Sequence, residues 1–302
     1  MNIEKNVLEE IKKAIGAENV RKNEPMAPHL SMKAGGAARY FLTPCTEEGL
    51  CRLVKILSRH GYEYYVLGNG SNIIVRDEGY DGIIINMNKG FDSLEIHGNY
   101  MMAQAGVLLK DAAYSALEAK LSGLEFACGI PGSCGGGAGM NAGAYGGELK
   151  DVIKEVKVVT EYGTFEKYSN SEMRFGYRHS ICADLPVVIT EVVFELSPGR
   201  YSDIKAKMDD LTVKRAQKQP LEYPSCGSVF KRPKGYFAGK LIMDSGLAGF
   251  SIGGAQVSSK HCGFIINKGN ASASDVLELI EYIKKTVYEK QEVRLECEVK
   301  IL

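Results

Sequence analysis

Two glycine-rich stretches contain the residue types and spacings of this chain that most suggest chemistry. The longer, GIPGSCGGGAGMNAGAYGGE, places nine glycines within residues 129–148, and the shorter, VLGNGSNIIV, covers residues 66–75. Because glycine costs backbone entropy on folding, a dense run marks tight turns or a main chain that must approach another group closely. Backbone N–H groups in such loops suit a phosphate chain or the flat face of a large ring. Two tight hairpins are the alternative, and spacing alone leaves both open.

Neither stretch fits a standard nucleotide-binding pattern. GAGMNA at 137–142 has the form G-x-G-x-x-G/A, but a Rossmann loop must open a helix, and the GAYGGELKD that follows is a poor helix start. GNGSNI at 68–73 lacks the third small residue, and no G-x-x-x-x-G-K-[ST] loop occurs. What remains is two loops at strand ends whose small polar side chains are Ser71, Asn72, Ser133 and Asn141.

Three further segments contain reactive residue types. RFGYRHS at 174–180 sets two arginines beside a tyrosine and a histidine, which suits a carboxylate or phosphate, although such clusters are usually solvated turns. In PSCGSVFKRP at 224–233, Ser228 lies outside any G-x-S-x-G elbow, so a hydrolase triad is unsupported. Glu298 lies among other charged residues, where an exposed face is the default. The five histidines show no metal-ligand spacing, and we assign no metal.

Composition and charge describe a globular protein with two or three compact units. The 302 residues are 45% hydrophobic and 25% charged, which is enough for real cores. Lys+Arg and Asp+Glu both number 37, so no net charge attracts nucleic acid or an acidic membrane. The eight cysteines include no C-x-x-C pair and indicate reduced thiols. No apolar run approaches the roughly 18 residues of a membrane span, so we expect a cytoplasmic protein without signal peptide or anchor.

Periodicity predicts the elements that position these segments. Ile3, Val7, Ile11 and Ile15 recur every four residues, as on one face of a helix ending at Gly16. Alternation of apolar and charged residues over 292–301 predicts a strand with Glu298 in its middle. Further helices are expected over 46–60, 202–219 and 272–290, and further strands within 62–87 and over 152–160 and 187–196. At SPGRYSD the pattern changes from mixed helices and strands to two helical segments around a loop-rich middle, which predicts a boundary near residue 200.

Six ordered segments together resemble the UDP-N-acetylenolpyruvoylglucosamine reductase (UDP-N-acetylmuramate dehydrogenase) family. They are VLGNGSNIIV, GIPGSCGGGAGMNAGAYGGE, RFGYRHS, RAQKQP with PSCGSVFKRP, GGAQVSSKHCGFIIN and LECEVKIL, and they run from about residue 30 to residue 302. The resemblance implies an α+β fold. Residues 1–80 and 81–200 would form a two-part FAD-binding fold of the vanillyl-alcohol-oxidase type, and 201–302 a smaller α+β substrate domain. The absence of a long insertion after FGYRHS resembles the family's shorter subclass.

The resemblance also implies a reaction. It is the NADPH-dependent, FAD-mediated reduction of UDP-N-acetylglucosamine enolpyruvate to UDP-N-acetylmuramate in cytoplasmic peptidoglycan precursor synthesis, with FAD non-covalent and with no nucleic-acid or membrane partner. Arg178 matches the family arginine, which stabilises the negative charge that builds on the substrate carboxylate. Ser228 matches the general acid that protonates carbon. Glu298 matches a carboxyl that either orients the arginine or is protonated as a second donor.

The same matches imply ligand contacts. The expected FAD contacts are Gly68, Asn69, Gly70, Ser71, Asn72, Pro131, Gly132, Gly135, Gly136, Asn141, Ala142, Gly143, Tyr145 and Arg215. Lys218 and Lys231 are expected partners of the UDP diphosphate, with solvated lysines as the alternative. The chain departs from the family pattern at Leu30, Ala37 and Lys300, where threonine, proline and arginine are common. Lysine at position 300 keeps the charge but loses the bidentate fork.

Two other functions explain part of the pattern. Another FAD-dependent oxidoreductase of the same superfamily, acting on a small hydroxy acid, would share both glycine loops but would not need GSVFKRP and GGAQVSSKHCGF. A non-catalytic regulator that binds flavin or a nucleotide sugar would not need Arg178, Ser228 and Glu298 together. The behaviour of the flavin with NADPH and with the enolpyruvyl sugar discriminates among these functions.

Overall fold

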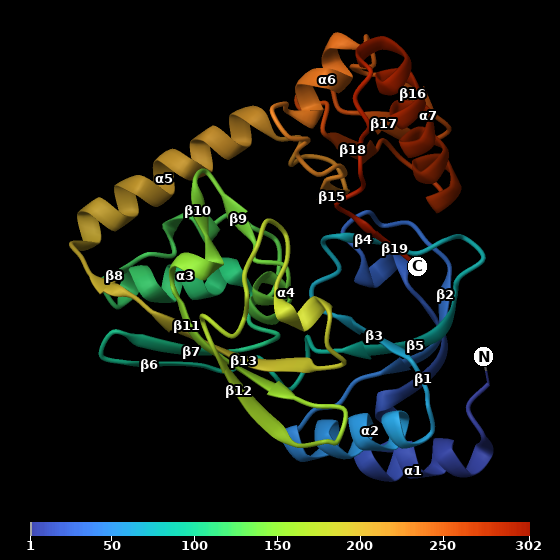
Figure 1. Ribbon diagram of the computed structural model, residues 1–302, viewed down its shortest axis with the longest axis vertical. Helices are drawn as coiled ribbons and strands as arrows, with labels where there is room; N and C mark the ends of the chain where they lie inside the picture. The colour runs from blue at the N-terminus through green and yellow to red at the C-terminus, as the bar shows by residue number, and fades with distance from the viewer. Residues whose placement is uncertain (1) are drawn as a thin grey trace. The chain divides into compact units, whose positions relative to one another are not determined.

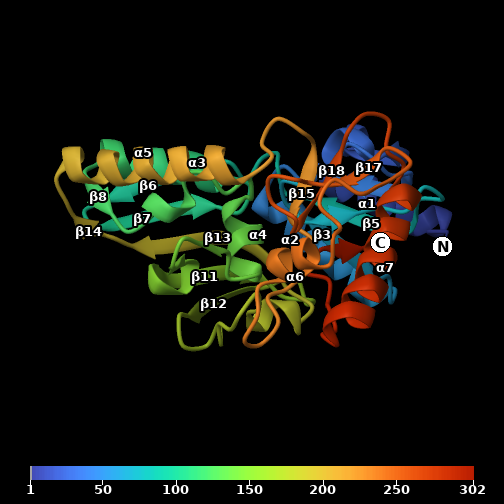
Figure 2. The same ribbon diagram turned by 90° about the horizontal axis from the view of Figure 1, so that it is seen from above.

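The computed structural model describes residues 2–302, which form two compact units assembled from interleaved segments (Figures 1 and 2). The first unit contains the residues up to Lys22, Tyr40–Asn69 and Gly82–Val213, and the second contains Asn23–Arg39, Gly70–Asp81 and Lys214–Leu302. The sequence predicts domain boundaries at residues 80 and 200. These compact units do not test those boundaries, which stay a prediction. No helix among the described residues combines the length and apolar character needed to cross a membrane.

A pair of amphipathic helices opens the first unit. Helices α1 (Lys5–Ile15) and α2 (Glu47–Arg59) lie side by side in Figure 1 and bury their apolar faces in the same core. The helix predicted from apolar residues at every fourth position is confirmed, because Val7 and Ile11 are fully buried and Gly16 ends α1. The Thr46 hydroxyl accepts the Gly49 N–H at 3.1 Å and caps α2.

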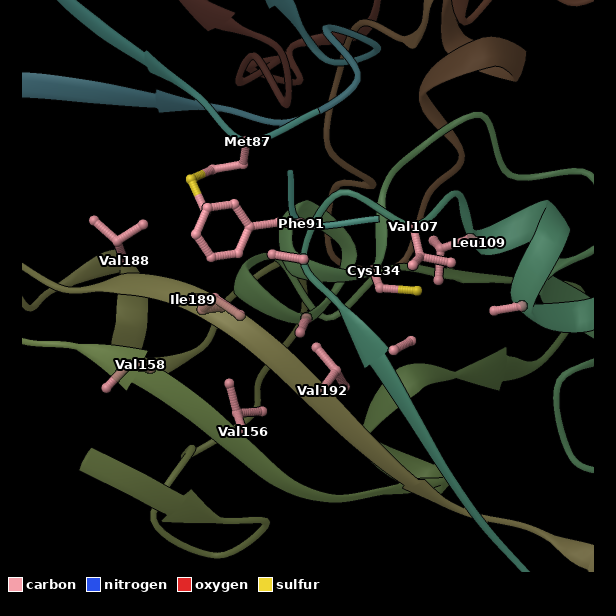
Figure 3. Packing of buried hydrophobic residues seen from close by; sticks show 14 of the residues in the cluster. Met87, Phe91, Val107, Leu109, Cys134, Val156, Val158, Val188, Ile189 and Val192 are labelled. Carbon is pink, nitrogen blue, oxygen red and sulfur yellow. The ribbon is translucent and has the colours of Figure 1, made fainter. Parts of the chain in front are cut away.

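Two larger sheets contribute strands to the first unit. One has the order β1 (Val20–Pro25), β2 (Ala37–Leu42), β5 (Tyr80–Asn86) and β3 (Tyr64–Leu67), and β3 runs parallel to β5. The other is antiparallel, with the order β12 (Phe165–Ser169), β11 (Ile153–Val159), β13 (Val188–Glu195), β7 (Tyr100–Gln104) and β6 (Leu94–His97). Figure 3 shows Phe91 and Met87 beside Val156 and Val158 of β11 and Val188 and Val192 of β13, which belong to the core of this unit.

Short elements surround the long glycine stretch in the first unit. Helix α3 (Leu109–Glu118) precedes it, and Leu121–Ser122 (β8) pairs with Ser197–Pro198 (β14). Within the stretch, helix α4 (Cys134–Gly139) forms a turn and a half that the sequence did not predict. It is followed by the hairpin β9 (Gly143–Ala144) and β10 (Gly147–Glu148), so no α-helix begins at GAYGGELKD, as expected.

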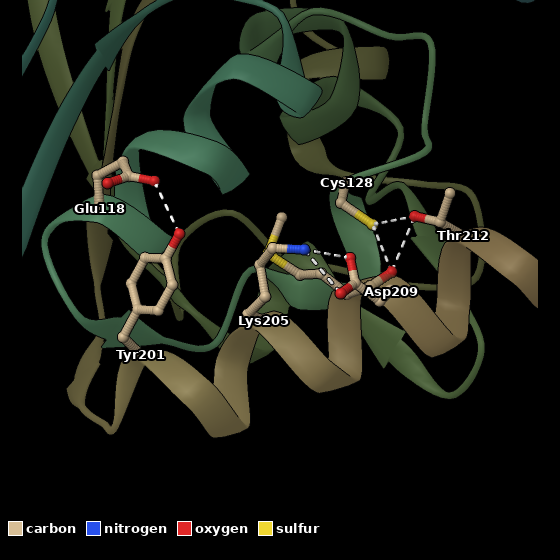
Figure 4. Close-up of polar contacts among 7 residues, drawn as sticks. Glu118, Cys128, Tyr201, Lys205, Asp209 and Thr212 are labelled. Carbon is tan, nitrogen blue, oxygen red and sulfur yellow. Dashed lines mark hydrogen bonds and ion pairs between the residues drawn. The ribbon is translucent and has the colours of Figure 1, made fainter.

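Helix α5 (Tyr201–Lys218) begins in the first unit, and polar contacts fix its start there (Figure 4). The Tyr201 hydroxyl donates to Glu118 at 3.3 Å, and Lys205 pairs with Asp209 at 2.7 Å one turn further on. Only Ile204 and Met208 of this helix are buried, so charged residues cover most of its surface. The expected helix over 202–219 is confirmed.

The second unit has its own core, built on one sheet and two helices. The sheet order is β15 (Ser225–Ser228), β18 (Phe264–Asn267), β17 (Ala255–Val257) and β16 (Ser251–Ile252), and the helices are α6 (Ala238–Asp244) and α7 (Ala273–Gln291). Asp77 accepts the N–H groups of Ala273 and Ser274 at 2.8 and 2.7 Å. A distant segment therefore caps the predicted helix over 272–290.

The predicted C-terminal strand over 292–301 is largely wrong. Only β19 (Lys300–Ile301) is a strand, and it runs parallel to β4 (Ile73–Ile74). Cys297 forms a single antiparallel bridge with Phe230. Three residues after Phe230, Pro233 has no N–H to donate, so the pairing of these two segments cannot continue past it. Glu298 is accordingly half-buried near a bridge, not exposed in mid-strand.

Candidate active site

The first glycine stretch turns sharply where β3 ends at Leu67. Gly70 has φ +62°, and a Cβ there would lie 2.0 Å from the His29 carbonyl oxygen. A Cβ on Gly68 would lie 2.5 Å from the Ser133 hydroxyl oxygen. Glycine is therefore required at Gly70 by conformation and by space, and at Gly68 by the close approach of the second stretch.

The loops of both stretches present backbone donors. Among the residues described, the N–H groups of Asn69, Gly70 and Ser71 donate to no protein acceptor, and the same is true of Gly132 and Ser133. Successive unused N–H groups in a turn bind an anion well. The run at Asn69, Gly70 and Ser71 fits a diphosphate, which is the chemistry expected of a dinucleotide cofactor such as FAD.

Side-chain contacts tie the two stretches together within the first unit. The Asn69 amide donates to the Pro131 carbonyl at 2.7 Å, and the Asn88 amide donates to the Gly68 carbonyl at 3.0 Å. Ser133 caps α4 by accepting the Gly136 N–H at 3.3 Å. Gly135 instead faces the protein, since a Cβ there would meet Ala105 at 2.6 Å. Its missing side chain therefore allows tight packing.

Asn141 is fully buried in a left-handed conformation, with φ +46°. Its amide nitrogen donates to Glu148 at 3.0 Å and to the Gly176 carbonyl at 2.9 Å. Its side-chain oxygen accepts the Lys150 N–H at 3.0 Å. Both amide hydrogens therefore have protein acceptors, and the backbone N–H donates to the Ala138 carbonyl at 3.2 Å, so the expected FAD contact of Asn141 stays a prediction.

The hairpin after α4 presents the remaining residues of the second stretch. Tyr145 and Gly146 both have positive φ, at +52° and +86°, as a two-residue type I′ turn requires. The Tyr145 side chain is 43% exposed at the tip, so its ring is accessible to a ligand. Ala142 is buried, and its N–H donates to the Gly137 carbonyl at 2.9 Å.

Arg178 lies in a strained loop that reaches this hairpin. Its φ is +55°, in the left-handed region that costs energy for a residue other than glycine. Its guanidinium donates to the Gly143 carbonyl at 3.4 Å and lies 5.2 Å from the centre of the Tyr177 ring. The structure thus brings Arg178 and the second glycine stretch together within the first unit.

Ser228 ends β15 in the second unit, opposite Phe264 of β18. Its hydroxyl donates to the Phe230 carbonyl at 3.4 Å, a long and weak contact. His261, which sequence reasoning did not select, accepts the Gly263 N–H at 3.1 Å, and a Cβ on Gly263 would lie 2.9 Å from its ring and 3.4 Å from the Ser228 hydroxyl oxygen. Burial lowers the pKa of His261 and favours the neutral ring. The sequence signal that could have selected His261 was its position in SSKHCGF, within one of the segments that resemble the family.

Glu298 is held beside Ser228 in the second unit through its backbone. Its N–H donates to the Val229 carbonyl at 2.8 Å, and its carbonyl accepts the Asn72 amide at 3.3 Å. The structure therefore brings Ser228, Glu298 and Asn72 together. Arg178 belongs to the first unit with Asn141 and Gly143.

The remaining expected residues lie on the second unit. Arg215 is half-buried on α5, and Lys218 is exposed at its end. Lys231 pairs with Glu296 at 3.4 Å, with both side chains exposed. Of the positions that depart from the family pattern, Leu30 is buried, Ala37 begins β2 and Lys300 is exposed in β19.

Comparison with known proteins gives matches over most of the chain. The FAD binding domain family matches residues 38–169, and the C-terminal domain of UDP-N-acetylenolpyruvoylglucosamine reductase matches residues 219–302. The reductase of that name from Geobacillus thermodenitrificans is 53% identical over 287 residues, covering 95% of this chain and 94% of the relative. The Clostridium perfringens reductase is 50% identical over 285 residues, covering 94% and 93%.

A solved structure agrees with these matches. The crystal structure of UDP-N-acetylenolpyruvylglucosamine reductase from Thermus caldophilus has a TM-score of 0.81 at 36% identity and covers 93% of this chain and 98% of its own. A FAD binding domain and this C-terminal domain together define an FAD-containing oxidoreductase, and they confirm the expected α+β fold class. The chain belongs to the UDP-N-acetylenolpyruvoylglucosamine reductase family. Its reaction is the FAD-dependent reduction of enolpyruvyl-UDP-N-acetylglucosamine in peptidoglycan synthesis, as the motifs predicted.

Proposed function

We propose that Arg178, Ser228 and Glu298 perform the chemistry of this reaction in the cytoplasm, with NADPH as the nicotinamide reductant. The observation that supports this most strongly is the left-handed conformation of Arg178, whose guanidinium reaches the Gly143 carbonyl at 3.4 Å. Strain of this kind persists where the surrounding structure maintains it, and it concentrates at functional sites. Bound FAD supplies the hydride carrier between the nicotinamide and the enolpyruvyl group.

Arg178 stabilises charge that appears during the reaction. Addition of hydride to the terminal carbon of an enol ether moves negative charge onto the neighbouring carbon and its carboxylate. A guanidinium remains protonated throughout, so Arg178 offers a permanent positive charge to that carboxylate. Because its loop is already ordered, no reorganisation is needed when the charge develops.

Ser228 then donates its hydroxyl proton to the neighbouring carbon, which completes the D-lactyl ether. Serine is a weak acid, but an enolate-like carbon is a strong base, so a well-placed hydroxyl suffices. The single long contact to the Phe230 carbonyl holds this proton only weakly. Solvent must replace the proton before the next turnover.

Glu298 is the carboxyl partner in this proposal. Its backbone is fixed by Val229 and Asn72, so its side chain starts from a defined position. Ionised, it orients the arginine, and protonated, it is a second donor to the substrate carboxylate. Replacement by glutamine separates these roles, because glutamine keeps a donor and loses the charge.

The glycine stretches bind FAD in this proposal, with the N–H groups of Asn69, Gly70 and Ser71 directed to its diphosphate and Arg215 near the cofactor. Lys218 and Lys231 bind the UDP diphosphate as mobile point charges. We propose no nucleic-acid partner, because the net charge is zero.

An anaerobic titration tests the assignment. The purified protein should be yellow, should bleach when NADPH is added and should regain colour with UDP-N-acetylglucosamine enolpyruvate. Bleaching without that recovery would favour a flavoenzyme of another substrate class. A colourless protein that fails to take up added FAD would contradict the assignment of the glycine stretches.

A further inference from the structure

The loop that contains Arg178 depends on contacts outside itself. Arg174 and Arg178 both have positive φ, at +45° and +55°, within five residues. Within the loop, Gly176 and His179 share two backbone hydrogen bonds of 2.9 and 3.4 Å, and at its base the Ile181 N–H donates to the Met173 carbonyl at 2.8 Å. Two left-handed residues so close together need external support.

Asn141 supplies part of that support from beneath the loop. Its amide donates to the carbonyl of Gly176, two residues before Arg178, and the same amide nitrogen donates to Glu148. The side chain is completely buried, and its oxygen also accepts the Lys150 N–H, so these three partners fix its orientation. The Arg178 loop is therefore coupled to Glu148 through one buried amide.

Glu148 is coupled to Arg178 by a second route through the hairpin. It pairs with Gly143 across β9 and β10, and Gly143 provides the carbonyl that Arg178 contacts. Glu148 also pairs with Lys150 at 2.7 Å. Its pKa is lowered mainly by Lys150, with contributions from Asn141 and the positive charge of Arg178, so it is an anion near that guanidinium.

We propose that Glu148 is a positioning residue that holds Arg178 in its working geometry through Asn141 and the hairpin, an inference that rests on the proposed function of Arg178. No sequence motif selected Glu148, and it does not need to touch substrate for this role. Its side chain keeps Asn141 oriented, which fixes the Gly176 carbonyl, and its backbone places the Gly143 carbonyl. Loss of Glu148 should leave flavin binding intact and misplace the guanidinium.

Glu148 also has a local structural role, which the experiment must separate. Together with Asp151 it forms a capping box on the 3-10 helix η4 (Leu149–Asp151), in which Asp151 accepts the Glu148 N–H at 3.0 Å. The variant Asp151→Ala removes this half of the box but leaves the contact between Glu148 and Asn141. It is therefore the matched control.

The test measures both flavin half-reactions of the holoenzyme by anaerobic stopped flow in Glu148→Ala, Glu148→Gln, Asp151→Ala and Arg178→Lys. In Glu148→Ala, reoxidation by the enolpyruvyl sugar should slow by roughly 10- to 100-fold, the usual cost of misplacing an oriented group, while reduction by NADPH changes less than about twofold. Glu148→Gln, which keeps an acceptor for Asn141, should lose less. If Glu148→Ala does not fold, Glu148→Gln provides the test in its place. Asp151→Ala should match the wild type.

The four variants distinguish the positioning role of Glu148 from the proposed role of Arg178. Normal reoxidation in both Glu148 variants, alongside slow reoxidation in Arg178→Lys, would overturn the positioning role and leave the role of Arg178 intact. Equal slowing of both half-reactions, or equal slowing in Asp151→Ala, would reduce Glu148 to a helix cap and would also overturn the proposal. Normal reoxidation in Arg178→Lys would overturn the proposed function and this inference together.

Discussion

Arg178 and Ser228 are held in place by different kinds of structure. Arg178 lies in an irregular loop of the first unit, in a left-handed conformation that buried polar side chains maintain. Ser228 lies at the end of a short, bulged strand in the second unit, directly after Gly227 with φ +76°, and backbone pairing with Phe264 fixes its position. A loop residue of this kind depends on particular side chains elsewhere, whereas a strand residue depends mainly on the ladder.

This difference has a functional meaning. A guanidinium that must meet a developing charge gains from a rigid, preset direction, and a side-chain network supplies it. A hydroxyl that must release a proton gains from weak local bonding, and the 3.4 Å contact of Ser228 provides that. Substitutions around Arg178 should therefore change stability and rate together, and those at Ser228 should change rate alone.

Replacement of Ser228 should give the largest effect and the cleanest separation. In Ser228→Ala, flavin reoxidation should slow by roughly 10²- to 10⁴-fold, the range for loss of a general acid, with reduction by NADPH nearly unchanged. The free energy of unfolding should change by less than about 0.5 kcal/mol, because only one weak hydrogen bond is lost. Stopped flow and urea unfolding measure the two quantities. Equal loss of both half-reactions would remove Ser228 from its assigned role.

Replacement of Asn141 should show the opposite behaviour, with a large loss of stability. Asn141→Ala leaves the Lys150 N–H without its acceptor and the Gly176 carbonyl with only the 3.4 Å bond from His179, and alanine tolerates positive φ less well than asparagine, so we expect a loss of about 3 kcal/mol. Asn141→Gly, which tolerates that φ, should lose less. Urea unfolding of both variants measures the difference. Wild-type stability in Asn141→Ala would show that the loop does not need this amide.

The loop near Arg178 should also be the more acid-sensitive of the two regions. The pKa of Glu148 is lowered, so its ionised form favours the folded state. Its stabilisation is complete above the ordinary value of 4.5 and is lost as the pH falls through the lowered pKa. Hydrogen exchange at neutral pH and well below 4.5 should show protection falling at Gly176 and His179 more than in β15.

A control isolates the Glu148 carboxyl in that experiment. His179 contacts a second carboxylate, Asp184, at 3.0 Å, so the measurement needs a variant in which only Glu148 has changed. In Glu148→Gln the loss of protection below 4.5 should disappear. If it persists in this variant, another group causes the acid sensitivity.

The smallest expected effect is at the start of α7, and it tests whether the effects predicted above are specific. Asp77→Ala removes the acceptor for two N–H groups at the start of α7, which should lower stability by about 1 kcal/mol. Both half-reactions should keep wild-type rates, because α7 supports the core of the second unit and holds no proposed site residue. A selective loss of reoxidation in Asp77→Ala would show that general destabilisation imitates a positioning effect.

Sequence periodicity was sufficient to predict the helices that bury one apolar face. Val7 and Ile11 identified α1, and the helices over 46–60, 202–219 and 272–290 form as expected. Ordered motifs were sufficient for the family, the cofactor and the reaction. They also selected Gly68 and Gly70, where close approach and positive φ exclude a side chain.

Features set by tertiary contacts escaped the sequence. Helix α4 is rich in glycine, which propensity disfavours, and forms because Ser133 caps it and Gly135 packs on Ala105. The strand expected around Glu298 ends early, since its partner segment meets Pro233. Glu148 resembles an ordinary surface charge in GGELKD, and only its contact with Asn141 reveals its connection to Arg178.

The most direct test of the central claim is the pair of flavin half-reactions in Arg178→Lys. Lysine keeps the charge but loses the planar fork that the loop presents, so reoxidation by the enolpyruvyl sugar should slow by about 100-fold. Reduction by NADPH should stay within about twofold of the wild type, because no carboxylate charge develops in that step. If both half-reactions keep wild-type rates, Arg178 is a structural residue, and the account of the site is wrong.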